Sequence, residues 1–318
     1  MNSRKFLIYS TVLILIAGTW GLLQFFAPRS QEEEKKQLLF RDLTQDKIEE
    51  IQLQRAGETI RLKKDREWQI LQPLRTKAEG SVVDSLIRTL TQLKAERRYS
   101  EKQLEGPEFG LVPPRLRVSF LARGKWSELQ AGNKTVVGND YYVRVSNSPE
   151  LALISAPSVQ DLDRSLFDLR DKRVFSLTLQ QVKGLEILAP GNLFLLEKTP
   201  EGWRQKDGGR TKLDPGKVES FLNEWLSLQA KGFAGTGIEK PEWGLIDPSY
   251  KIRLLTGDKT TREEVLSLGK EAKEKGLSAK STLQNEIVFL PSDILKKIPQ
   301  SLEDWKTAQP APPEKKGS

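Results

Sequence analysis

The longest apolar run of the chain lies near its N-terminus, where the residues from Phe6 to Ala27 carry no charge. As a helix rising about 1.5 Å per residue, this run spans roughly 33 Å, enough to cross the core of a bilayer. The pattern predicts a transmembrane signal anchor over residues 6–27, preceded by a cytoplasmic tail at 1–5. A cleaved signal peptide is the alternative, but the run exceeds the usual apolar region of such peptides and no A-x-A site closes it.

Charges on either side of this run do not fix its orientation. Basic residues flank both ends, namely Arg4 and Lys5 before it and Arg29, Lys35 and Lys36 after it. Acidic residues have little influence under the positive-inside rule, and the basic residues on the two sides nearly balance. The short N-terminal tail favours a cytoplasmic N-terminus, and we expect a single-pass protein of the inner (cell) membrane with an extracytoplasmic body.

Two polar segments bound this body. Residues 28–37 read as a short polar stalk, and residues 307–318 read as a disordered tail rich in proline and lysine. The chain between them repeats itself. The segment that begins at Val83 aligns with the one at Val218, and PEFGLVPP aligns with PEWGLIDP. The body is therefore expected to be two copies, 38–170 and 171–306, and a repeat this long indicates a duplicated domain rather than a solenoid.

Hydrophobic periodicity predicts the elements of each copy. In copy one, Ile51 and Leu53 alternate with polar residues, and so do Ile60 and Leu62, which predicts a hairpin that turns at Ala56-Gly57. Pro190-Gly191 supplies the corresponding turn of copy two. A tryptophan then opens a third strand, and an amphipathic helix follows. The apolar positions of the two helices are Val83, Leu86, Ile87, Leu90 and Leu93, and Val218, Phe221, Leu222, Trp225 and Leu228.

Further strands follow the helix in each copy. The pattern predicts them near 115–121, 126–131, 140–146 and 150–155, and near 250–256, 263–268, 277–282 and 286–290. A short helix is expected near 158–169, and Asp214-Pro215 is typical of a helix N-terminus. The fold class predicted is α+β: an N-terminal transmembrane helix followed by two tandem copies of an antiparallel sheet, each with one main amphipathic helix packed on it.

Composition narrows the chemistry available to the protein. The 318 residues include no cysteine and no histidine, which excludes disulfides, histidine-based triads and metal sites with Cys or His ligands. The formal net charge is +8, but basic residues are interleaved with acidic ones. A nucleic-acid interface needs a patch of one sign, so we expect no nucleic-acid partner. We also expect no cofactor, no metal and no catalytic residue.

One motif, P-E-[FW]-G-L-x-x-P, occurs once in each copy. Its residues are Pro107, Glu108, Phe109, Gly110, Leu111 and Pro114, and Pro241, Glu242, Trp243, Gly244, Leu245 and Pro248. We interpret it as a structural corner with a buried aromatic residue and a glycine of positive φ. A ligand site using Glu108 and Glu242 is the alternative. Trp68 and Trp203 occupy equivalent positions, and we expect both to be core residues.

Two other sequence features are weak evidence for a function. Ser267 and Lys270 match the serine–lysine spacing of penicillin-recognising enzymes, but they fall at a strand end and the companion motifs are absent. The segment from Asp168 to Arg173, at the junction of the copies, alternates in charge. It reads as a solvated connector, or as a set of ion pairs between the copies.

The order of these features resembles a known family. A tryptophan follows a hairpin, and an amphipathic helix, a GL-x-x-P element, a YYVRV strand and an L-R-D-K segment follow in turn. Over about residues 45–305 this is similar to the bacterial domain-of-unknown-function family numbered 4340. Members are similar to proteins encoded beside ABC-type transporters of the gliding-motility class. The resemblance implies an envelope role near a transporter and no catalytic residue.

Copy two departs from that family pattern at one strand. Leu277, Ser278, Ala279 and Lys280 stand where copy one has Tyr141, Tyr142, Val143 and Arg144. A site that depends on the tyrosine pair would therefore exist only in copy one.

The sequence is compatible with three functions. The first is a membrane-anchored, non-enzymatic envelope protein that contacts the bilayer through residues 6–27 and binds a membrane-protein partner, as an accessory to an ABC-type transport system. The second is a glycan- or lipid-binding envelope module, which a groove rimmed by exposed tryptophan or tyrosine would favour. The third is an envelope hydrolase that uses two carboxylates, as glycoside hydrolysis requires.

Overall fold

A computed structural model describes most of the body of the chain. It covers residues 36–100, 109–146, 148–206, 211–235, 237–238, 240–257, 262–284 and 286–306, together with Leu13, Ile16 and Thr19. The tail predicted at 1–5, most of the predicted anchor and stalk, and the tail predicted at 307–318 lie outside these residues. Within the described residues, no helix combines the length and the apolar character needed to cross a membrane.

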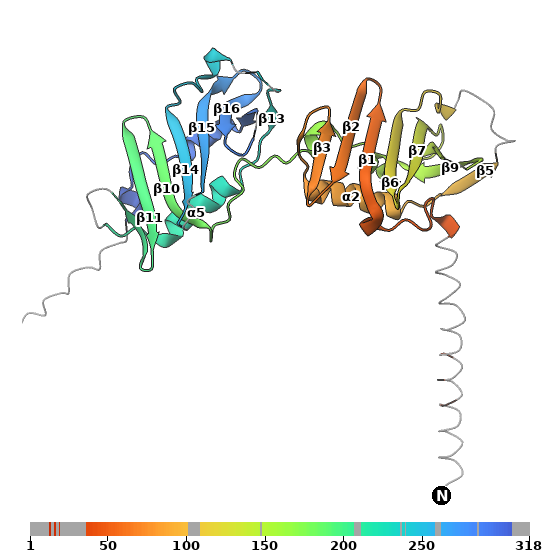
Figure 1. Ribbon diagram of the computed structural model, residues 1–318, viewed down its shortest axis with the longest axis horizontal. Helices are drawn as coiled ribbons and strands as arrows, with labels where there is room; N and C mark the ends of the chain where they lie inside the picture. Colours follow the sequence, from red (N-terminus) through yellow and green to blue (C-terminus); the bar gives the residue numbers. More distant parts are fainter. Residues whose placement is uncertain are drawn as a thin grey trace, which may run out of the picture. The chain divides into compact units, whose positions relative to one another are not determined.

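The chain divides into two compact units. Unit 1 comprises Met1–Asp171 and unit 2 comprises Lys172–Ser318. Each unit has its own large cluster of buried apolar side chains. Figure 1 labels many of the strands and the main helix of each unit.

Unit 1 is built on a nine-stranded sheet with the strand order β4-β3-β2-β1-β6-β7-β8-β9-β5. A 3-10 turn, η1 (Gln45–Lys47), precedes the first strand. The strands are β1 (Ile48–Arg55), β2 (Glu58–Lys64), β3 (Trp68–Gln72), β4 (Thr76–Lys77), β5 (Arg97–Ser100), β6 (Leu116–Ala122), β7 (Lys125–Lys134), β8 (Asp140–Val145) and β9 (Glu150–Ser155). The helices are α2 (Gly80–Thr91), α3 (Ala156–Leu162) and α4 (Leu166–Leu169).

Unit 2 is built on an eight-stranded sheet with the order β12-β11-β10-β14-β15-β16-β17-β13. Its strands are β10 (Val182–Ala189), β11 (Asn192–Thr199), β12 (Gly202–Gln205), β13 (Gly232–Phe233), β14 (Tyr250–Thr256), β15 (Glu263–Ala272), β16 (Gly276–Ser281) and β17 (Ile287–Leu290). The helical elements are α5 (Pro215–Leu226) and the 3-10 turns η4 (Pro241–Trp243), η5 (Ser292–Lys297) and η6 (Glu303–Trp305).

The two sheets follow the same plan. In both, the first hairpin pairs with a strand that comes after the helix, so β1 lies between β2 and β6, and β10 lies between β11 and β14. The paired strands are antiparallel throughout, and the hairpins turn at the two residues that the sequence indicates, after Arg55 and after Ala189. The prediction of two tandem antiparallel sheets in an α+β fold is confirmed.

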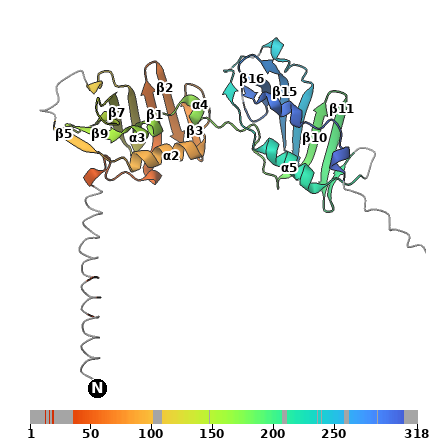
Figure 2. The ribbon, with the colours of Figure 1, turned by 180° about the vertical axis from the view of Figure 1, so that it is seen from behind.

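One amphipathic helix covers one face of each sheet. In α2 the buried residues are Val83, Leu86, Ile87 and Leu90, and in α5 they are Val218, Phe221, Leu222 and Trp225. Their spacing of three and four residues places them on one helical face, as predicted. Leu93 and Leu228, predicted as the last apolar position of each helix, are buried but lie beyond its end. Figure 2 shows both helices lying across the strands. The face of each sheet opposite its helix is called the open face below.

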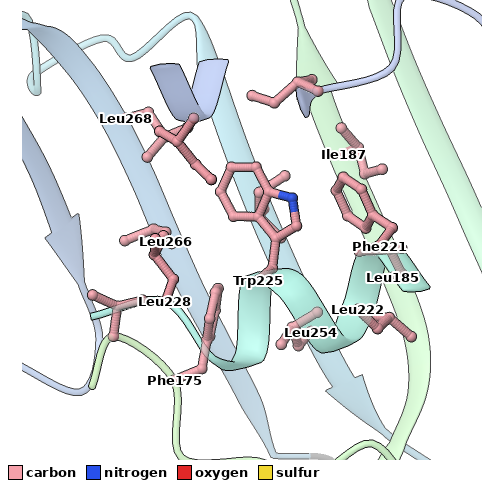
Figure 3. Packing of buried hydrophobic residues seen from close by; sticks show 14 of the residues in the cluster. Phe175, Leu185, Ile187, Phe221, Leu222, Trp225, Leu228, Leu254, Leu266 and Leu268 are labelled. Carbon is pink, nitrogen blue, oxygen red and sulfur yellow. The ribbon is translucent and has the colours of Figure 1, made fainter. Parts of the chain in front are cut away.

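The helix–sheet contact forms the core of each unit. In unit 2, Trp225 projects from α5 towards the sheet, with Phe175 and Leu254 nearby (Figure 3). Trp203 is 1% exposed and Trp68 is 6% exposed, and each belongs to the core of its own unit. Burying a side chain of this size contributes several kcal/mol, because truncation of a buried tryptophan typically costs about 3–5 kcal/mol.

The structure differs from the predicted elements at one helix and at the edges of the two sheets. The single short helix expected near 158–169 is two helices, α3 and α4, because Asp163 ends the first and Ser165 begins a capping box for the second. The two-residue strand β4 is not predicted by the sequence pattern, and neither are β5 and β13. The last two are short edge strands whose partners, β9 and β17, lie far along the chain, so no local alternation reveals them.

Candidate functional site

The repeated corner motif lies against the open face of each sheet, at the edge formed by the last strands. In unit 2, Trp243 is 5% exposed and its ring meets Phe289 edge-on, at 5.5 Å between centroids. Gly244 has a φ of +67° and its backbone N–H donates to the carbonyl of Pro241 at 3.0 Å, which closes the turn. Leu245 belongs to the same small apolar cluster.

The same corner in unit 1 keeps this arrangement with different partners. Phe109 meets the ring of Tyr142 edge-on at 4.8 Å, Gly110 has a φ of +64°, and Leu111 is buried. Leu111 and Pro114 form an isolated bridge across the turn. Pro107 and Glu108 lie outside the described residues.

Glycines in two strands allow the corner to sit this close to the sheet. A Cβ atom on Gly132 of β7 would lie 2.0 Å from the carbonyl oxygen of Phe109, and one on Gly269 of β15 would lie 2.1 Å from that of Trp243. Both glycines lie at a register shift in their strands. A glycine inside a strand often marks a bulge or the close approach of another backbone. Gly132 and Gly269 are therefore the sequence signal for this close approach, and they lie outside the repeated motif itself.

The remaining residues of the second corner motif and the tyrosine pair of unit 1 contact neighbouring protein groups. The side chain of Glu242 is 66% exposed and lies 3.8 Å from Lys240. Pro248 is buried and Pro241 is exposed. The Tyr141 hydroxyl accepts a hydrogen bond from Arg115 at 3.1 Å, whereas Tyr142 packs on the corner. In unit 2, Ser278 stands in place of Tyr142 and its Oγ donates to the carbonyl oxygens of Trp243 and Lys270.

The open face of unit 1 carries a polar hollow of about 450 Å³. Its lining combines carboxamides, hydroxyls, one carboxylate and one indole: Gln52, Gln54, Ser119, Trp126, Ser127, Glu128 and Ser146. Trp126 is 45% exposed. Glu128 accepts hydrogen bonds from Ser119 at 3.1 Å and from Gln130 at 2.7 Å, and it lies 3.3 Å from Arg117.

A buried carboxylate lies further along the same face. Glu50 is 4% exposed and forms ion pairs with Arg61 at 2.7 Å and with Lys63 at 3.0 Å. Burial raises the pKa of Glu50, but the hydrogen bonds from Arg61 and Lys63 outweigh it, so the pKa lies below its ordinary value. Glu50 is therefore a charged residue that links β1 to β2 through these ion pairs.

The open face of unit 2 is more apolar than that of unit 1. Directly opposed residues of neighbouring strands share a face, and this places Leu193 beside Leu188, and Leu195 beside Glu186. We call the set Leu188, Leu193, Leu195, Leu255 and Val265 the apolar strip. Leu193 is 55% exposed, and the other four are half-buried. In unit 1, Thr59 and Arg61 stand where the strip has Leu193 and Leu195.

A third feature is a basic hollow of about 400 Å³ in unit 1. It forms where the segment before β1 meets the hairpin between β6 and β7. We call it the basic hollow, and it is lined by Phe40, Arg41, Asp42, Leu43, Lys47, Phe120, Ala122, Arg123, Lys125 and Ser127. No local motif marks it, because its two segments are about 80 residues apart in the sequence.

Two observations on the described part of the chain concern metal binding and acid–base groups. No group of three or more acidic residues there is placed to hold a metal ion. The resolved pKa shifts there favour charged forms: the hydrogen bond from Lys47 lowers the pKa of Asp46 to about 2, and the one to Glu224 raises the pKa of Lys297. Neither shift brings a group towards neutral pH.

Comparison with known proteins gives one finding. The family described as "Domain of unknown function (DUF4340)" matches residues 68–245, more than half of the chain. The matched region begins at the core residue Trp68 and ends at Leu245 of the second corner. No curated protein and no solved structure matches the chain.

Proposed function

This chain belongs to the DUF4340 family, and from that starting point we propose that it is a membrane-anchored, non-enzymatic envelope protein that binds a membrane-protein partner, as an accessory to an ABC-type transport system. The uncharged run over residues 6–27 supports the anchor, and the body would lie outside the cytoplasm. Leu13, Ile16 and Thr19 are helical, and the side chains of Leu13 and Ile16 are exposed.

The observation that carries the partner-binding proposal is the apolar strip. Core sheet positions are buried by the helix of the unit, whereas these leucines face away from it and Leu193 is 55% exposed. Apolar side chains grouped at the surface of a folded domain and bordered by polar residues are typical of a protein interface. Glu186 and Arg253 form an ion pair at 3.2 Å within the same face, and this gives the strip polar neighbours, as protein interfaces have.

The duplicated plan provides a matched test of this interface. Leu193→Glu places a charge in the apolar strip, and Thr59→Glu places the same charge at the equivalent position of unit 1. Full-length variants are expressed in a deletion strain and purified in mild detergent, and mass spectrometry identifies any ABC-type transporter subunits that co-purify. We expect Leu193→Glu to abolish co-purification and complementation, and Thr59→Glu to retain both. Equal retention by both variants would refute the strip as the interface.

Anchor and orientation have their own test. Deletion of residues 1–30 should abolish complementation by detaching the body from the membrane, whereas Glu108→Gln and Glu242→Gln should leave it intact. A reporter that is active only outside the cytoplasm, fused after Ser318, should be active. Loss of function in either glutamate variant, with an anchorless secreted body still working, would favour an enzyme or a soluble binding protein instead. Activity of a cytoplasmic reporter would reverse the proposed orientation.

A second candidate function, glycan binding, is favoured by the polar hollow on the open face of unit 1. An exposed indole beside carboxamide and hydroxyl groups matches a sugar ring, which has an apolar face and a polar rim. Calorimetric titration of the full chain with an N-acetylglucosamine tetramer tests it. Binding that Trp126→Ala abolishes and Leu193→Ala leaves unchanged supports this candidate, and the absence of binding removes it.

The hydrolase candidate has less support. Hydrolysis of a glycosidic bond usually requires two carboxylates that flank one cleft. Three surface hollows are lined by one carboxylate each: Asp42, Glu128 and Glu201.

A further inference from the structure

We propose that the basic hollow of unit 1 binds the headgroup of an anionic phospholipid. This rests on the proposed membrane anchor, since it assigns a lipid contact to the unit that follows the anchor. Its lining carries four basic side chains, Arg41, Lys47, Arg123 and Lys125, against one carboxylate, Asp42. All four basic residues are exposed, so their charges are accessible to a ligand.

Neighbouring charges reduce this excess only in part. Lys47 pairs with Asp46 at 2.8 Å, and Asp46 lies next to the hollow rather than in its lining. One Arg41 nitrogen lies 3.5 Å from the carbonyl oxygen of Lys36. The guanidinium groups of Arg41 and Arg123 suit a phosphate, because their forked donors can contact two of its oxygens at once.

The floor of the hollow is apolar. Phe40 and Phe120 meet edge-on at 4.9 Å between ring centroids, and Leu43 and Ala122 are the other apolar residues of the lining. A hollow that combines a basic rim with an apolar floor fits a ligand that carries a phosphate on a glycerol and acyl body. A free phosphate ion would use only the rim. Basic side chains near an anionic membrane surface attract its lipid headgroups.

The second unit supplies an internal comparison, because its equivalent positions close the site. Phe175 stands where unit 1 has Arg41, and it is a core residue, 1% exposed. Gln181 and Gly257 replace Lys47 and Arg123. Arg262 corresponds to Lys125, but its guanidinium is held by the buried carboxylate of Glu264 at 2.6 Å and by Ser176. The basic hollow therefore belongs to the unit that directly follows the predicted anchor.

The test measures lipid binding by the full chain in neutral detergent. The probe is dioctanoyl phosphatidylglycerol, with dioctanoyl phosphatidylcholine and inorganic phosphate as comparison ligands. Charge reversal at the hairpin, Arg123→Glu with Lys125→Glu, should weaken binding of phosphatidylglycerol at least tenfold. The control, Lys64→Glu with Arg75→Glu, makes the same change in net charge at exposed positions outside the hollow and should leave binding unchanged.

The comparison ligands decide what the hollow recognises. Phosphatidylglycerol should bind more tightly than both, and higher salt should weaken its binding, because exposed charges are screened. Equal affinity for phosphatidylcholine, equal affinity for inorganic phosphate, or an equal loss in the control variant would each overturn the proposal. Lipid binding is measured without the transporter, so its failure is distinct from a failure of co-purification, which tests the proposed function.

Discussion

At the scale of single residues, the two strand glycines control how closely the corner approaches its sheet. Gly269→Ala would place a methyl group against the carbonyl oxygen of Trp243, and Gly132→Ala would do the same at Phe109. Backbone must then shift, and we expect each variant to lose about 1–3 kcal/mol of unfolding free energy in urea titrations. Gly80→Ala, at the start of α2 with no atom near its Cβ, is the control and should be neutral or stabilising. If Gly269→Ala matched it, the close approach would be wrong.

The charge of Arg123 favours the proposed lipid binding, whereas its backbone conformation is unfavourable for an arginine. It has a φ of +52° and, with Gly124, forms a two-residue hairpin turn in which both residues have positive φ. Asparagine is preferred at the first position of such turns. Arg123→Asn should therefore raise the unfolding free energy by about 0.5–1 kcal/mol. The same variant should weaken binding of phosphatidylglycerol, and a purely structural arginine would not show that loss.

Glu50 predicts a pH dependence of stability. Its pKa in the folded protein is below its ordinary value, so its contribution is present above the ordinary pKa and is lost as pH falls through the folded pKa. Wild type should exceed Glu50→Gln in unfolding free energy at pH 7, and the gap should close in strongly acidic solution. Urea titrations across pH measure it. A gap that stays constant to acidic pH would contradict this role.

At the scale of elements, the two main helices begin differently although they are equivalent. Asp214 caps α5, and its Oδ1 accepts from the backbone N–H of Gly216 at 2.8 Å, whereas the side chain of Glu79 makes no capping hydrogen bond to α2. We expect Asp214→Ala to cost about 1 kcal/mol. Glu79→Ala should cost less than half of that. Thermal and urea unfolding of both variants compares them, and equal losses would show that the cap is not the cause.

At the scale of the whole molecule, each unit has the apolar core that independent folding requires. Near the boundary of the two units, backbone hydrogen bonds join residues of the same unit, such as Glu79 with Leu169 and Lys172 with Ala230. We expect residues 36–171 and 172–306, expressed separately, to give two cooperative unfolding transitions that together reproduce that of the intact body. Circular dichroism and calorimetry measure this. A fragment that stays unfolded would show that its unit depends on the other.

Sequence alone determined the duplication, the two hairpins, the amphipathic helices and the α+β class. Local periodicity predicts these features, because alternation fixes the faces of a strand and a spacing of three and four residues fixes the face of a helix. The Asp214-Pro215 helix start was predictable for the same reason, since a cap acts over three residues.

The places where polar residues from distant segments meet depend on how the strands pair in three dimensions. Arg41 joins Arg123 and Lys125 because the chain before β1 crosses the end of a hairpin formed much later in the sequence. Trp126 joins Gln52 and Ser119 because β1, β6 and β7 are neighbours in the sheet. Strand pairing over long separations brings such groups together, and no periodicity within one segment encodes which strand will be the neighbour.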